Sequence, residues 1–194
     1  MRARCTLLLL TALALPAASP SARADEPTIR LQPTEGTELS KKDEAAVRKT
    51  LVDYMAALQT RDYSKAGEML DRPSVLAAVD PMVTTIASDS THYAAAMTRI
   101  FGVSTRDSIE ARSTGRLFES LMAYMMELNP SASEMLSKAS IEVLAARRMG
   151  DRVHVAYQVS LPPSEPGGMP YEQITAQRMT KTGGKWRILF SIAQ

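Results

Sequence analysis

Two histidines are the side chains of this chain best suited to acid–base chemistry. His92 follows Asp89 by three residues, which places the imidazole and the carboxylate on the same side of a helical turn. An imidazole held by a carboxylate is a common general base, so the Asp89–His92 pair is a candidate for catalysis. His154 is a second candidate, as a base facing a pocket on the far side of a strand. For both, the sequence favours a simpler interpretation: a solvated helix face for His92 and the exposed rim of a sheet for His154.

Metal and cofactor sites are not expected from the residue types present. Zinc and iron sites need clustered cysteine, histidine and carboxylate ligands, whereas this chain has 2 histidines far apart and 1 cysteine. Met122, Met125 and Met126 could hold Cu(I) through their thioethers, but methionine is more often an adaptable lining of a core or pocket. The Gly-Gly pairs at 167–168 and 183–184 lie in turns between predicted strands, which is not where phosphate-binding loops occur.

The methionines point instead to a soft apolar interior. The chain has 12 methionines, Met1 included, against 3 phenylalanines, and flexible thioether side chains adapt to ligands of irregular shape. A deformable cavity for a small apolar ligand, lipid-like or aromatic, fits this composition, and so does a plain core. The lining of such a cavity is expected to come from the predicted helices and one strand: Tyr93, Met97, Met122, Met125 and Tyr157.

Helices must position most of these side chains, because apolar residues recur at helical spacing up to about residue 139. Ser40 and Asp43 resemble a capping box in front of an amphipathic helix over 41–59. Asp80-Pro81 resembles the start of another helix, which continues to about residue 101, with a polar middle over 87–91 where a break would fit. We also expect a short helix after Tyr63, a helical turn or two from Asp71, a loop over 103–115, a helix through Leu117 and Leu128, and a short helix over 132–139 capped by Ser131 and Glu134.

After residue 140 the spacing of apolar residues changes from helical to alternating. The run VHVAYQVSL over 153–161 alternates apolar and polar residues, as a half-buried strand does. Helices followed by an antiparallel sheet predict an α+β fold, with the N-terminal helices packed on the C-terminal sheet in a single domain over 40–194. The strands are expected over 141–149, 152–161, 171–180 and from 186, with Trp186, Ile188, Phe190 and Ile192 on one face of the last.

The first helix and the closing strands together resemble a known superfamily. The helix pattern runs into Asp62-Tyr63, and the closing strands read VHVAYQVSL and YEQITAQRMTKTGGKWRILF. Over 41–70 and 141–192 the chain resembles the nuclear transport factor two-like superfamily, which has the ketosteroid isomerase-like cone fold. The resemblance implies a curved antiparallel sheet wrapped around helices, with an apolar pocket inside the cone. The helix residues that carry it are Val47, Leu51, Tyr54, Ala57 and Leu58.

The resemblance leaves several functions open. The superfamily contains isomerase- and cyclase-like enzymes, which need an acid or base inside the cone, together with many non-catalytic binding domains. Because no motif maps a catalytic residue onto this chain, we favour a non-catalytic domain that binds a small apolar ligand or a partner protein. Sheets in this superfamily often pair face to face, so a homodimer is a further expectation. The layout is also similar to that of periplasmic phospholipid carriers, which makes a lipid carrier another alternative.

Residues 1–24 have the features of a secretory signal peptide. Arg2 and Arg4 precede a short apolar run, and Ala22-Arg23-Ala24 offers a cleavage site. The apolar run is too short to span a bilayer as a helix, which takes about 20 residues, so no integral membrane segment is expected. We expect an exported protein, periplasmic or secreted, whose folded domain follows a flexible leader over 25–39.

Cleavage would also change the charge of the protein. The chain has 23 Lys+Arg and 21 Asp+Glu, and loss of Arg2, Arg4 and Arg23 leaves 20 basic and 21 acidic residues, a net charge of −1. A near-neutral balance without a basic stripe argues against nucleic acid as a partner, because that binding depends on clustered lysine and arginine. The same cut removes Cys5, so the stability of the domain must come from packing rather than from a disulfide.

Overall fold

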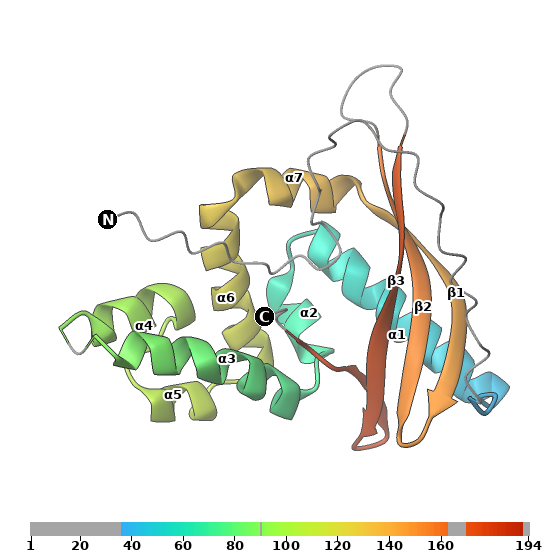
Figure 1. Cartoon of the computed structure of the whole chain (residues 1–194), viewed down its shortest axis with the longest axis horizontal. Helices are drawn as coiled ribbons and strands as arrows, with labels where there is room; N and C mark the ends of the chain where they lie inside the picture. Colours follow the sequence, from blue (N-terminus) through green and yellow to red (C-terminus); the bar gives the residue numbers. More distant parts are fainter. Residues whose placement is uncertain (1–35, 90, 163–169, 192–194) are drawn as a thin grey trace, which may run out of the picture.

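A computed structural model describes residues 36–89, 91–162 and 170–191 of the chain. Within these ranges helices come first and strands last, so the predicted α+β class is confirmed (Figure 1). The expected signal peptide and most of the expected leader lie outside the described residues. The elements are α1 (Lys41–Gln59), α2 (Tyr63–Glu68), α3 (Arg72–Ala87), α4 (Tyr93–Phe101), α5 (Arg106–Ala111), α6 (Thr114–Leu128), α7 (Pro130–Lys138), β1 (Ser140–Met149), β2 (Arg152–Leu161), β3 (Tyr171–Thr182) and β4 (Lys185–Ile188).

The strands form an antiparallel sheet in the order β1-β2-β3-β4. β2 shows the predicted alternation: one face is buried in the hydrophobic core and the other, which includes His154, is partly exposed. The buried face packs against α1, and α2 to α7 lie to one side of the sheet (Figure 1). The core therefore lies between the inner face of the sheet and the helices. The β2 residues in it are Val153, Val155, Tyr157, Val159 and Leu161.

Polar contacts fix the start of α1 against the sheet. The amide of Asp43 donates a hydrogen bond to Ser40 Oγ at 3.1 Å, as the capping pattern predicts. The carboxylate of Asp43 also accepts hydrogen bonds from Lys181 Nζ (2.8 Å) and Trp186 Nε1 (3.2 Å). The hydrogen bond from Lys181 holds the pKa of the Asp43 carboxyl below its usual value. The first turn of α1 is thus tied to the hairpin of β3 and β4.

Short segments outside the strands pair with both edges of the sheet. At the β1 edge, Thr37 and Arg148 exchange two backbone hydrogen bonds of 3.1 Å. At the β4 edge, Ile188 donates to the carbonyl oxygen of Met69 (2.9 Å) and accepts from the amide of Asp71 (2.8 Å), in a parallel bridge with Leu70. At these positions backbone groups that an edge strand would leave open are therefore paired.

Helices α2 and α6 cross at a contact between two glycines. A Cβ on Gly67 would lie 2.8 Å from the Cα of Gly115 and 2.6 Å from the Cβ of Phe118. A Cβ on Gly115 would lie 2.6 Å from the carbonyl oxygen of Ser64. Two helix backbones approach this closely only where neither carries a side chain at the crossing point. This contact sets the distance of α6 from the rest of the fold.

The middle of the chain differs from the prediction in two helices. Pro81 lies inside α3 instead of starting a new helix, and Asp71 is the N-cap of this longer helix. Pro81 is exposed, so water can satisfy the carbonyl group that its missing amide leaves unpaired. The predicted loop over 103–115 contains α5, whose last carbonyls are held by Arg72. Its guanidinium donates to the backbone oxygens of Glu110 and Arg112.

Two boundaries also differ. α7 begins at Pro130, and the hydroxyl of Ser131 donates to the side-chain oxygen of Asn129 (2.7 Å) instead of capping a later start. β4 ends at Ile188, and Phe190 leaves the sheet because its amide donates to Ser74 Oγ of α3 at 2.9 Å. Ile192, expected on the same strand, lies outside the described residues.

Replacing Gly67 with alanine should destabilise the fold, because the added methyl group has no room between Gly115 and Phe118. Overpacking typically costs about 1–3 kcal/mol, so the free energy of unfolding measured in urea should fall by about that amount. Lys65→Ala, at an exposed site of the same helix, is the matched control and should change it by less than about 0.5 kcal/mol. Equal stability of the two variants would contradict the close helix contact.

Candidate functional site

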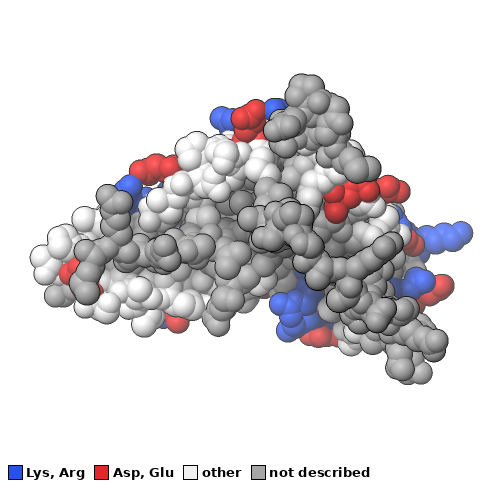
Figure 2. Space-filling view, turned by 45° about the horizontal axis from the view of Figure 1, so that its top comes forward, with Lys and Arg blue, Asp and Glu red and all other residues white. Residues whose placement is uncertain are grey.

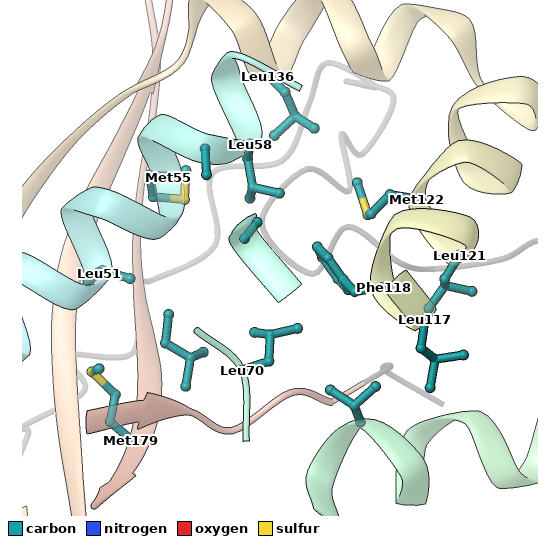
Figure 3. Packing of buried hydrophobic residues seen from close by; sticks show 14 of the residues in the cluster. Leu51, Met55, Leu58, Leu70, Leu117, Phe118, Leu121, Met122, Leu136 and Met179 are labelled. Carbon is teal, nitrogen blue, oxygen red and sulfur yellow. The ribbon is translucent and has the colours of Figure 1, made fainter. Parts of the chain in front are cut away.

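A cavity of about 90 Å³, the methionine-lined cavity, lies where α1, α6 and α7 meet. Met122, Met125 and Met126 follow one another at helical spacing on α6, so they share one face of that helix. Figure 3 shows Met122 and Phe118 pointing from α6 toward α1, the helix that carries Leu58. The described lining residues are Tyr54, Leu58, Phe118, Met122, Met125, Met126, Leu136 and Phe190.

Aromatic rings form a second wall of this cavity. The ring centroid of Phe118 lies 6.4 Å from that of Tyr54 and 5.6 Å from that of Phe190, and the second pair is edge-to-face at 84°. Edge-to-face pairs contribute about 0.5–1.5 kcal/mol beyond the area they bury. Phe190 reaches this position because the chain leaves the sheet after Leu189, whose amide still donates to the carbonyl oxygen of Arg178 at 2.8 Å. The segment after β4 therefore closes one side of the cavity.

Tyr54 brings a polar, ionisable group to the described lining. Its hydroxyl makes no hydrogen bond with another described residue. Burial raises the pKa of Tyr54 above its ordinary value, and the neighbouring Tyr157 raises it further. Burial also raises the pKa of Tyr157, on the inner face of β2. At neutral pH Tyr54 is therefore a neutral phenol, which can donate a hydrogen bond to a ligand but is a poor base.

The size of the cavity limits what it can hold. At about 30 Å³ for each water in the liquid, 90 Å³ corresponds to about three water molecules. Sites for drug-sized ligands usually have about 300–1,000 Å³. The three methionines are unbranched and change rotamer readily, so the wall they form can yield to a somewhat larger molecule.

The structure brings some of the predicted lining residues together and separates others. Met122 and Met125 line the cavity. Met97 is fully buried in the core at α4, Tyr93 is partly buried at the start of the same helix, and neither belongs to the lining. Tyr157 lies near Tyr54 but outside the lining.

Sequence reasoning missed other lining residues. Tyr54 and Leu58 lie four residues apart on the apolar stripe of α1, and this spacing was an available signal for them. Phe118 lies four residues before Met122, on the same face of α6. For Phe190 the sequence offers no signal, because its place in the wall depends on the end of β4 and on the bond to Ser74.

The two histidines lie on the surface. His92 Nδ1 and Asp89 Oδ2 are 3.0 Å apart, and both side chains are exposed. The hydrogen bond with His92 lowers the pKa of Asp89. His154 lies on the outer face of the sheet, where the strand register places it between Arg147 and Arg178. None of these residues lines the methionine-lined cavity.

The described surface carries mixed charge. On the face that Figure 2 shows, acidic and basic side chains are interspersed among the described residues. Among residues 36–89, 91–162 and 170–191, no group of three or more His, Cys, Asp or Glu is placed to hold a metal ion. Within the same ranges, no helix combines the length and the apolar character needed to cross a bilayer.

Comparison with known proteins yields little. No family model matches the chain, and no curated protein matches it. Among solved structures, the chain is similar to a protein from Xanthomonas campestris assigned as a calcium/calmodulin dependent protein kinase II association domain. The match has 13% identity, covers 80% of this chain and 90% of that chain, and has a TM-score of 0.30. A score this low supports no inference, so the fold class rests on the elements themselves.

Replacing Tyr54 with phenylalanine should flatten the loss of stability at high pH. Because the folded protein raises the pKa of this phenol, its contribution is complete below the unfolded value of about 10 and is lost as the pH rises above it. The free energy of unfolding in urea should therefore fall less steeply above about pH 10 in Tyr54→Phe than in the wild type. Tyr157→Phe should act in the same direction. Identical slopes in Tyr54→Phe and wild type would contradict the raised pKa of this phenol.

Proposed function

We propose that this protein is an exported, non-catalytic domain that binds a small, compact apolar ligand in the methionine-lined cavity. The observation that carries the proposal is the described lining, in which seven apolar side chains are joined by one tyrosine. Few polar groups on largely apolar walls are typical of sites for small apolar molecules. The hydroxyl of Tyr54 would then orient a ligand that has an oxygen or nitrogen acceptor at one end.

An isomerase- or cyclase-like enzyme is supported less well. Such an enzyme needs an acid or base in the pocket whose pKa suits the working pH. The described lining contains no carboxylate and no imidazole, and the pKa of Tyr54 is moved away from neutrality. The Asp89–His92 pair and His154 lie on other parts of the surface.

A carrier of whole phospholipids is also supported less well. Two acyl chains need far more room than about 90 Å³, and side-chain rotation of three methionines cannot supply it. Binding a phospholipid would require α6 to move away from α1, against the close glycine contact that holds α6 on α2. We therefore favour a compact ligand over a long-chain lipid.

Benzene is a suitable first probe of this proposal, because it enters an apolar cavity of about 150 Å³ and the adaptable methionine wall lets a cavity of about 90 Å³ widen toward that size. In protein labelled with ¹³C at the methionine methyl groups, benzene should shift the NMR signals of Met122, Met125 and Met126. Met179, fully buried but outside the lining, and Met149, exposed on β1, are the controls and should not shift. Unchanged signals for all three lining methionines would contradict the proposal, as would equal shifts in the controls.

A second candidate function, self-association, is favoured by the outer face of the sheet. The strand register aligns Ala145, Ala156 and Ala176 in a row across β1, β2 and β3. Beside this row Leu144 and Ile174 are 41% and 66% exposed. A sheet face with small residues at its centre and exposed apolar side chains beside them suits the core of a protein interface.

Charges on this outer face suit a second copy of the chain as the partner. On β1, Arg147 lies on one side of the alanine row and Glu142 lies on the other. A two-fold axis that crosses the strands would place Arg147 of each copy opposite Glu142 of the other. Within the chain, the exposed carboxylate of Glu38 lies 3.9 Å from Arg147, too far for a strong ion pair.

Charge reversal tests this pairing. We expect light scattering at micromolar concentration to give a dimer for the wild type and a monomer for Arg147→Glu, because like charges then face each other twice. The double variant Arg147→Glu with Glu142→Arg should restore the dimer. Lys42→Glu, an exposed reversal on α1, is the control and should remain a dimer. A monomeric wild type would remove this candidate.

A further inference from the structure

A second hollow of about 800 Å³, the basic groove, opens between α2, the starts of α3 and α6, and the hairpin of β3 and β4. It shares no described lining residue with the methionine-lined cavity. Its volume lies within the range of about 300–1,000 Å³ that is usual for sites of small molecules. Met69, Leu70 and Pro73 give part of the groove an apolar surface.

Basic side chains from three elements surround this groove. They are Lys65 of α2, Arg72 of α3, and Lys185 and Arg187 of β4. Lys65, Lys185 and Arg187 have no ion pair with another described residue. Cations that converge on one hollow without a protein counter-ion raise the local concentration of anions and favour their binding.

The acidic lining residues do not cancel this charge. Asp71 is 8% exposed, and its carboxylate accepts a hydrogen bond from the amide of Ser74 (3.1 Å) as the N-cap of α3. The hydroxyl of Thr182 approaches the same carboxylate at 3.5 Å. Glu68 is exposed on α2 and is the other acidic residue of the lining. Two acidic side chains therefore face four basic ones.

One of the four cations is held in place before any ligand binds. Arg72 Nη1 donates to the carbonyl oxygen of Arg112 at 2.7 Å, and its Nη2 donates to that of Glu110. A guanidinium fixed in this way loses little side-chain freedom when it meets an anion. Lys185 and Arg187, two residues apart on β4, lie across the groove and supply cations that can adjust to the ligand.

We propose that the basic groove binds a small organic anion, with its carboxylate or phosphate among Lys65, Arg72, Lys185 and Arg187. The apolar part of the ligand would lie against Met69, Leu70 and Pro73. This site and its ligand class are independent of the methionine-lined cavity, so the proposal stands or falls separately from the proposed function.

Benzoate and inorganic phosphate are the probes, and benzyl alcohol is the uncharged counterpart of benzoate. We expect benzoate, phosphate or both to shift the backbone amide NMR signals of Thr182 and Gly183 at millimolar concentration, and benzyl alcohol to leave them unchanged. A response to benzoate alone identifies a carboxylate site, and a response to phosphate alone identifies a phosphate site. If neither anion shifts these signals, or if benzyl alcohol shifts them as benzoate does, the proposal is wrong.

Single variants identify the cations involved. Lys185→Gln and Arg187→Gln should each weaken binding of the responding anion about tenfold, because each removes one charge-assisted hydrogen bond. Lys138→Gln, exposed on α7, an element that contributes no residue to the described groove lining, should bind as the wild type does. Equal affinity in all three variants would overturn the proposal. A protein that binds polyglutamate, an acidic polymer, but neither benzoate nor phosphate would overturn it as well. The methyl signals of Met122 and Met125 report on the other cavity in the same samples.

Discussion

The contact between Gly67 and Gly115 is the constraint on which the arrangement of this fold depends most. It brings the backbones of α2 and α6 closer than any side chain would allow, and α2 follows α1 after a turn of three residues. The distance of α6 from α1 is therefore fixed by backbone rather than by adjustable side chains. Phe118, within one turn of Gly115, fills the space at this contact. Met122, one turn further on, lies beside Phe118 on the side that faces α1 (Figure 3). The methionine-lined cavity begins where α6, beyond Gly115, again carries large side chains toward α1.

At its opposite end α1 is held by polar contacts instead. The carboxylate of Asp43 receives hydrogen bonds from Lys181 and Trp186, so the helix start cannot slide along the sheet without breaking them. Polar contacts therefore hold one end of α1, and close backbone packing holds the helices at the other end. Any change of shape must take place in the interior between these two ends. Flexible methionines suit that interior better than branched side chains, because they fill irregular space in several rotamers.

The features predicted correctly from the sequence are those that depend on residues close together in the chain. The start of α1 follows from Ser40 and Asp43, and the strands follow from alternation and from glycine turns, so the α+β class could be read from the chain. The continuity of α3 through Pro81 could not, because it depends on solvent reaching one exposed turn. α5 was missed because its six residues are held by Arg72, which is remote in sequence. Of the five residues expected to line a cavity, only Met122 and Met125 belong to the lining. Phe190 joins it through a tertiary hydrogen bond to Ser74, which no periodicity reveals.

The pairing of Thr37 with β1 and of Leu70 with β4 bears on how copies of this protein meet. An open edge strand is a template on which further chains can add without end, and it is the usual starting point of fibrils. Here each outer strand already has a partner over part of its length, supplied by the same chain. Strand addition is hindered at these paired positions on both edges, whereas a two-fold contact through the outer face of the sheet would close on itself after two copies. The edges thus favour assemblies of finite size over filaments.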